Sequence, residues 1–339
     1  MTAVLDALTN GLQRALSDDP HVVLLGEDIL DPYGGAFKVT RGLSSAFPER
    51  VLATPVSEAG MTGLAAGMAL RGLRPVVEIM FGDFSTLAVD SLVNTAAKLR
   101  WMYNEQVSVP LVLRTPMGGR RGYGPTHSQS LEKIFLGIPG LKVVAASHFG
   151  DPGELLYRAI LQQDDPVLFV EHKLLYGLQV VDAAAAADFA VERVGSAEIF
   201  PAYRLAMRGA PAPTLTLAAY GYMTELARQA LVKLAYEHEI FAELIVLTQL
   251  APLDAAPVLE SVIRTGHLLT VEEGTLSAGW GAEILARCAE TLGGQLKAVR
   301  RVAAMETPIP AAAGLERSSL PDVDDILHAA ETIGAQLHA

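Results

Sequence analysis

The stretch TPVSEAGMTGLAAGMALRGLRPVVEIMFGDFSTLAVDSLVNTAAK, from Thr54 to Lys98, decides the fold of this chain. Glu58 stands at the start of a predicted helix whose many Gly and Ala residues allow close approach to another backbone. The apolar run Pro75–Phe81 predicts a buried strand, and a second helix is expected from about Ser85 to Asn94. A carboxylate at a helix start is either a cap or a functional acid, and the residues alone leave both open.

Strand-like runs with helical patterns between them recur on both sides of this stretch. In the first half they cover His21–Gly26, Pro110–Arg114, Leu141–Ala145 and Pro166–Glu171. In the second half they cover Thr214–Gly221, Ala242–Leu247, His267–Val271 and Ala298–Ala304. Continuously apolar strands alternating with helices predict α/β domains whose mostly parallel sheets are covered on both faces. We expect a first domain at 1–177, a connection at 178–213, with room for a short hairpin, and a second domain at 214–339.

Composition narrows the class of protein. The chain has 339 residues, a net charge of −12, 50% hydrophobic and 19% charged residues. The negative charge argues against nucleic acid or an anionic membrane as the main partner, and no apolar run is long enough to span a bilayer. The apolar excess therefore predicts burial against other chains. The single cysteine, Cys288, is expected to be a core residue, the alternative being a reactive thiol. The N-terminus shows no export signal, so a cytoplasmic enzyme or enzyme subunit is expected.

Common catalytic motifs are missing from the chain, which has no phosphate-binding P-loop, no dinucleotide fingerprint after a strand, no H-E-x-x-H and no G-x-S-x-G. His127, in the loop GYGPTHSQS, could shuttle protons or bind an anionic substrate, although such a residue is otherwise a surface or capping residue. Four acids lie at strand ends or on apolar helices, and together they predict a buried acidic cluster. They are Glu27, Glu58, Glu78 and Asp90.

Several blocks share their order and spacing with one family. They include LGED, YGGAFKVTRGL, RVLATPVSEAG, GLRPVVEIMF, RTPMGG, HSQS, PGLKVV, DPVLFVEHKLLYG, APLD, TGHLLTVEEG, GAEI and METPIP followed by Leu315–Glu316. The chain resembles, over nearly its whole length, the beta subunit of the decarboxylating component of 2-oxo acid dehydrogenase complexes. That resemblance implies two transketolase-like domains, one pyrimidine-binding and one C-terminal. It also implies thiamine diphosphate, an alpha2beta2 heterotetramer, a lipoyl acyltransferase core, and pyruvate, a branched-chain 2-oxo acid or acetoin as substrate.

The resemblance also implies roles for single residues. Glu58 matches the carboxylate that hydrogen-bonds a ring nitrogen of the cofactor's aminopyrimidine and can share a proton with it. Phe84 matches the aromatic residue on the pyrimidine, and Val56 and Met80 match residues lining its pocket. His127 matches a histidine that binds the 2-oxo acid carboxylate or acts in acylation of the lipoyl group. Glu27 and Asp90 match acids that connect the two active sites.

Departures from the family pattern matter as well. The chain lacks the G-D-G motif that holds Mg²⁺ and the diphosphate, so an alpha subunit is expected to supply that half of the site. Gln163 replaces an Asp near a possible K⁺ site formed around Leu161, Gln163 and Asp165. Val246 and Thr248 replace an acid and a base, and Leu87 replaces a polar residue of some relatives. Two alternatives stay open, a two-chain carboligase without a lipoyl partner and a non-catalytic assembly subunit.

Overall fold

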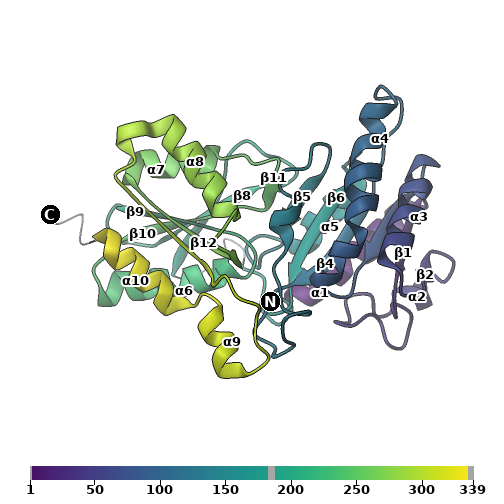
Figure 1. The fold of residues 1–339 in the computed structure, drawn as a ribbon, viewed down its shortest axis with the longest axis horizontal. Helices are drawn as coiled ribbons and strands as arrows, with labels where there is room; N and C mark the ends of the chain where they lie inside the picture. The colour runs from purple at the N-terminus through teal and green to yellow at the C-terminus, as the bar shows by residue number, and fades with distance from the viewer. Residues whose placement is uncertain (1, 182–187, 335–339) are drawn as a thin grey trace.

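The chain folds into two α/β units that lie side by side, as the computed structural model shows (Figure 1). The structure describes residues 2–181 and 188–334. The first unit carries the N-terminal half and the second unit the C-terminal half of the chain. Residues 182–187, inside the expected connection, lie outside the described residues, as do 335–339 of the expected second domain.

The first unit is built on a sheet of seven strands in the order β11-β5-β6-β4-β3-β1-β2. All neighbours pair in parallel except β11, which is antiparallel to β5. The strands are β1 (Val22–Gly26), β2 (Val51–Ala53), β3 (Arg74–Glu78), β4 (Val112–Met117), β5 (Lys142–Ala145), β6 (Val167–His172) and β11 (Gln249–Ala251). The helices are α1 (Val4–Asp18), α2 (Leu43–Ala46), α3 (Glu58–Leu70), η1 (Gly82–Ala88), η2 (Ser91–Ala96), α4 (Ala97–Met102), η3 (Glu132–Phe135) and α5 (Pro152–Leu161).

Both faces of this sheet are buried because successive strand side chains point to opposite sides. Val22 and Leu24 of β1 pack in one cluster with α1 and α5, whereas Val23 and Leu25 pack in another with α3 and η2. A Cβ added to Gly153 of α5 would lie 2.0 Å from a carbonyl oxygen of α1, so these two helices cross at a spacing that only glycine allows. The continuously apolar strands of the sequence are explained by this double cover.

The second unit is built on a six-stranded sheet in the order β13-β12-β9-β10-β8-β7. Its strands are β7 (Phe189–Val194), β8 (Ala202–Met207), β9 (Leu215–Ala219), β10 (Ala242–Val246), β12 (His267–Thr275) and β13 (Ala298–Ala304). Its helices are α6 (Met223–Glu237), α7 (Ala256–Thr265), α8 (Trp280–Leu292), η4 (Gly293–Gln295), α9 (Ala313–Ser319) and α10 (Val323–Gly334). Helices α7 and α8 cover one face, and α6 and α10 the other (Figure 1). The predicted fold class, two mostly parallel sheets covered by helices, is confirmed.

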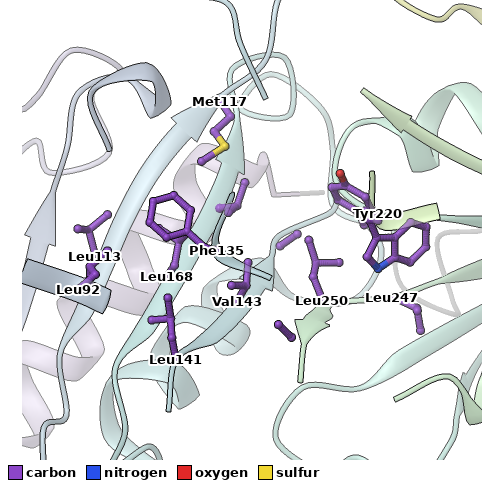
Figure 2. Packing of buried hydrophobic residues seen from close by; sticks show 14 of the residues in the cluster. Leu92, Leu113, Met117, Phe135, Leu141, Val143, Leu168, Tyr220, Leu247 and Leu250 are labelled. Atoms are coloured by element: carbon purple, nitrogen blue, oxygen red, sulfur yellow. The ribbon is translucent and has the colours of Figure 1, made fainter. Parts of the chain in front are cut away.

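Two segments of the chain lie in places that the sequence did not specify. The expected connection at 178–213 contains β7 and β8, an antiparallel hairpin at the edge of the second sheet. Strand β11 follows β10 of the second unit but pairs with β5 of the first, so it joins the two units. The largest core cluster is continuous across this junction, running from Leu113 through Val143 to Leu250 and Tyr220 (Figure 2).

The departures at Val246 and Thr248 fall beside this junction. Val246 is buried in the core of the second unit. The Thr248 hydroxyl donates to the Pro201 carbonyl oxygen at 2.8 Å, and the Thr248 carbonyl accepts from the Ala145 amide at 2.7 Å. Val246 therefore serves the packing of the second unit, and Thr248 serves the contact between the two units.

The span of the expected helix from Ser85 to Asn94 is divided between two short helices, the 3₁₀ helix η1 and the π-helix η2. Helix α4 follows directly after η2. The prediction of one regular helix was therefore wrong, because apolar spacing does not distinguish a regular from an over- or underwound helix. Within the described residues, no helix has the length and apolar character needed to cross a membrane.

Candidate active site

The central feature of the site is a pair of buried acids. Glu58 is the first residue of α3, and Glu27 follows directly after β1, at the carboxyl end of that strand. Each side chain is only 5% exposed. Burial and the neighbouring Glu58 raise the pKa of Glu27, and a hydrogen bond from the Ser57 backbone only partly opposes this. Two carboxyl groups placed together away from water tend to share a proton, which is an arrangement for proton transfer rather than for stability.

The residues expected around the pyrimidine ring lie along the edge of the same region. Val56 precedes α3 and is 79% exposed, so its side chain is free to contact another molecule. Met80 and Phe84 are half-buried, in the segment that leads from β3 into η1. Leu87, in the last turn of η1, is exposed. Helix η1 packs against α3, the helix that begins with Glu58, so this apolar surface lies on an element next to that helix.

His127 lies against this surface from a different part of the chain. Its imidazole makes edge-on contacts with the rings of Phe81, at 4.8 Å between centroids, and Phe84, at 5.1 Å. Thr126 Oγ1 lies 3.0 Å from His127 Nδ1 and can fix one tautomer of the ring. The structure thus brings His127 beside Phe84, one of the residues expected at the cofactor, although 43 residues of chain separate them.

Lys173 is a residue of the site that the sequence analysis missed. It follows β6 and is buried, and its Nζ donates to the carbonyl oxygens of Gly118 and His127, both at 2.6 Å. Burial lowers the pKa of Lys173 to about 8, although the carboxylates of Asp83 and Glu273 work in the opposite direction. Its ammonium lies 5.3 Å from the Phe81 ring centroid. Lys173 therefore fixes the backbone that carries His127. The motif DPVLFVEHKLLYG contains it, but no pattern in the sequence links it to the loop.

A buried charge network lies beneath the site. The Arg114 guanidinium of β4 binds Glu171 through two hydrogen bonds, at 2.7 and 2.6 Å, and also pairs with Glu78 of β3. The Tyr176 hydroxyl donates to Glu171 at 2.7 Å. Burial raises the pKa of Glu78, and the charge of Arg114 opposes that shift. Glu78 is thus a member of an ion-pair network.

Asp90 does not lie in a buried cluster, and the expectation that all four acids do so was wrong for this residue. Asp90 is exposed at the start of η2, where its carboxylate accepts a hydrogen bond from the Asn94 side chain at 2.7 Å. Asp90 immediately precedes the π-helix η2, and its side chain faces solvent there. Glu27 and Glu58 remain as the buried pair.

The acid of the expected cation site, Asp165, already has partners within the protein. Asp165 is paired with Arg100, at 3.1 Å, and with Lys142, at 3.3 Å, and the Gln163 side-chain amide donates to the neighbouring Gln162 carbonyl. Leu161 is the last residue of α5.

Cys288 of α8 is fully buried, and burial raises the pKa of its thiol to about 11. The prediction of a core residue is therefore confirmed.

The site fits the pyrimidine half of thiamine diphosphate. Glu27 Oε1 is buried and has no hydrogen-bond partner among the described residues. A free carboxylate oxygen in a unit that also offers the accessible apolar side chains of Val56, Met80 and Phe84 suits a flat ring that presents nitrogen atoms at its edge. Within 2–181 and 188–334, no cluster of three or more His, Cys, Asp or Glu side chains could hold a metal ion.

Comparison with known proteins identifies the class that this fold and site define. Residues 1–179 match the family described as "Transketolase, pyrimidine binding domain", and residues 206–326 match "Transketolase, C-terminal domain". A solved structure titled "Split gene transketolase, inactive beta4 tetramer" superimposes with a TM-score of 0.72 at 20% identity, covering 98% of each chain. The protein is therefore a transketolase-like α/β protein.

Relatives of higher identity narrow the class further. The pyruvate dehydrogenase E1 component subunit beta-2, mitochondrial, of Oryza sativa subsp. japonica is 41% identical over 97% of this chain and 85% of its own length. The acetoin:2,6-dichlorophenolindophenol oxidoreductase subunit beta of Cupriavidus necator is 37% identical over 96% and 95%. The pyruvate dehydrogenase E1 component subunit beta of Rickettsia bellii is 35% identical over 97% and 98%. The chain belongs to this family of E1 beta subunits of 2-oxo acid dehydrogenase complexes.

Proposed function

We propose that this chain provides the pyrimidine half of the active site in a thiamine diphosphate-dependent E1 component that oxidatively decarboxylates a 2-oxo acid and transfers the acyl group to a lipoyl group. The observation that carries the proposal is the buried Glu27–Glu58 pair, in the same unit as the contact between Phe84 and His127. Family membership makes the assignment to a dehydrogenase stronger than the alternative of a two-chain carboligase without a lipoyl partner. The buried and unpartnered Glu27 Oε1 at this site also argues against a purely structural subunit.

Each residue then has a definite task. When bound, thiamine diphosphate supplies the carbon nucleophile for the 2-oxo group and accepts the electrons left by departing CO₂. Glu58 hydrogen-bonds a nitrogen at the edge of the pyrimidine ring and exchanges a proton with it, and Glu27, whose pKa is raised by burial and by Glu58, is the neighbouring carboxyl group with which that proton can be shared. Phe84, with Val56 and Met80, excludes water from the ring. His127 presents its imidazole to the substrate carboxylate or to the lipoyl group.

The partners follow from what this chain lacks. Without a G-D-G motif, the diphosphate and Mg²⁺ are left to an alpha subunit, in an alpha2beta2 heterotetramer that docks on a lipoyl acyltransferase core. We do not extend the proposal to K⁺, because Asp165 is already paired with Arg100 and Lys142. The role of Asp90 in linking the two active sites stays a prediction. The same holds for the domain limits of 1–177 and 214–339 and for a cytoplasmic location.

The substrate is best sought among the compounds that the relatives' names give. Pyruvate and acetoin are the first candidates, and branched-chain 2-oxo acids complete the panel. The test measures reduction of an artificial electron acceptor, with CO₂ release as a second readout for the 2-oxo acids, in the presence of thiamine diphosphate and Mg²⁺, for this chain alone and with its alpha subunit. We expect activity only in the mixture. Activity of the isolated chain would contradict the half-site argument, and activity that never extends to a lipoyl acceptor would favour the carboligase.

The variant Glu58→Gln tests the role of the acid itself. Gln keeps the shape of the side chain but cannot exchange a proton, so the reconstituted enzyme should lose activity by a factor of about 10² or more, the range of general acid–base catalysis. The control is Glu49→Gln, which changes an exposed acid of the same unit. Normal turnover of the Glu58 variant would overturn the assignment, and unchanged melting of both variants would show that any loss is chemical.

A further inference from the structure

The loop from Gly118 to Ser130, which carries His127 between β4 and η3, has an unusual backbone. Four of its residues have positive φ angles, namely Gly118 at 93°, Arg120 at 68°, Gly122 at 69° and Gly124 at 77°. Arg120 is the demanding position, because a side chain there is disfavoured in the left-handed region. Such a segment keeps its conformation only where surrounding groups hold it. Lys173 binds the backbone of this loop at its first residue, Gly118, and at His127 near its other end. The residues between them need another partner.

That partner comes from the far end of the chain. Glu316 of α9 is only 4% exposed, and its Oε1 accepts a hydrogen bond from the Arg120 amide at 2.8 Å. Its Oε1 and Oε2 also receive the Gly122 amide, at 3.3 and 3.1 Å. Hydrogen bonds from amides to an ionised carboxylate are about twice as strong as neutral ones. One side chain therefore anchors the two amides at the centre of the loop.

Neighbouring groups of the second unit make further contacts with the loop. A Cβ on Gly119 would meet Leu320 Cδ1 at 2.5 Å, so the loop backbone lies directly on that side chain. The Arg120 guanidinium donates to the Pro321 carbonyl oxygen and lies 3.4 Å from Glu273 Oε2. Glu273 also accepts from the Gly119 amide at 2.8 Å. In Figure 1, α9 lies below the sheet of the second unit on the side toward the first unit, where it can reach this loop.

We propose that Glu316 is a positioning residue for His127, through which the C-terminal unit sets the geometry of a step that the first unit performs. Its carboxylate does not touch the acids Glu27 and Glu58 of the site, and acts only through the loop backbone. The inference rests on the proposed function in one respect, the catalytic role of His127. The attachment of the loop to Glu316 does not depend on that role.

Limited proteolysis tests the attachment on the chain itself. Arg121 is exposed at the middle of the loop, so trypsin can cut after it once the segment opens, giving fragments 1–121 and 122–339. Proteolysis follows the population of the open form, and two charge-assisted hydrogen bonds hold it closed. Glu316→Ala should therefore be cut on the order of tenfold faster than the parent, and Glu316→Gln, whose amide oxygen still accepts, less so. An unchanged rate at Arg121 in Glu316→Ala would overturn the proposal.

A matched control is available close by. Glu306 lies in the segment before α9. Its carboxylate likewise accepts a hydrogen bond from a backbone amide, that of Ser277 at 2.6 Å, but on a loop that carries no site residue. Glu306→Ala should leave cleavage after Arg121 within about twofold of the parent, because surface contacts away from the loop change little. Equal acceleration in both variants would mean general loosening of the C-terminal unit and would overturn a specific role for Glu316.

Kinetics of the reconstituted enzyme test the positioning. Glu316→Ala should slow the same partial reaction that His127→Ala slows, by roughly tenfold, and leave the other reactions within about twofold. The double variant should be no slower than His127→Ala, because residues acting through one group are non-additive. Multiplied losses would overturn the proposal, as would a His127→Ala enzyme of full activity. A wild-type assembly inactive on every 2-oxo acid would instead refute the proposed function, while proteolysis still decides the attachment.

Discussion

Replacing Arg114 by Met should strongly destabilise this protein. The Arg114 side chain is 1% exposed and is bound to two carboxylates, Glu78 and Glu171, that are 6% and 1% exposed. Removing one partner of a buried ion pair leaves uncompensated charge and typically costs about 3–5 kcal/mol. Arg100→Met is the matched control, since that guanidinium is 40% exposed and its pair with Asp165 is worth only about 0–1 kcal/mol.

The loss should depend on pH with a definite sign. The folded-state pKa of Glu78 lies above its unfolded value, so the folded chain binds more protons and stability falls as pH rises from the unfolded towards the folded pKa. Without Arg114 the upward pKa shift of Glu78 grows, because the positive charge that opposed this shift is gone. The difference in unfolding free energy between parent and Arg114→Met should therefore be smallest at acid pH and largest near neutrality.

Urea denaturation of the chain from pH 5 to pH 8, followed by circular dichroism, measures this difference. A second variant, Arg114→Met combined with Glu78→Gln and Glu171→Gln, should recover much of the stability, because no buried charge is left unpaired. An Arg114→Met chain no less stable than Arg100→Met would refute the reasoning. So would a destabilisation that grows toward acid pH.

Three further predictions concern single side chains. Cys288 should resist thiol reagents in the native chain and react only on unfolding, since burial raises the pKa of its thiol to about 11; rapid native-state labelling would contradict this. Lys173 has a folded pKa of about 8 against 10.5 unfolded, so the parent should gain up to roughly 3 kcal/mol relative to Lys173→Met as pH rises across that window, a gain measurable by denaturation at pH 7 and pH 10. The Gly118→Ala variant should have a looser loop and a melting temperature several degrees lower, because the added Cβ would lie 1.9 Å from His172 Nε2 at a φ of 93°. The control is Gly137→Ala, whose added Cβ meets no atom within 4 Å, so that this variant should melt like the parent.

Much of the fold could be predicted from local patterns. Strand β13 runs from Ala298 to Ala304, as expected from the sequence. Its apolar pattern is a local signal, which a sequence displays directly. The prediction of one regular helix after Phe81 was wrong because helix winding is not a local signal. Whether its turns wind as 3₁₀, π or α depends on what each residue packs against, and that is decided by the sheet beneath.

The candidate site divides in the same way. Glu58, Phe84 and His127 were found in the sequence because the family resemblance places them, and the structure then brought Phe84 and His127 within 5.1 Å. Lys173 and Glu316 were not found. Each acts on backbone atoms of the loop, and a backbone carbonyl or amide leaves no trace in residue identity.

The sequence by itself determined the α/β class, the two units, the buried position of Cys288 and the acid at the head of α3, because each depends on neighbours within a few residues. Tertiary structure alone decided the rest. The Arg114 network joins residues up to 57 positions apart, and the hydrogen bond from Arg120 to Glu316 joins residues 196 positions apart. It also placed β11 at the edge of the sheet that precedes it. Such contacts follow from how the strands are ordered and how the units pack, and the order of strands in a sheet is not written in the spacing of residues along the chain.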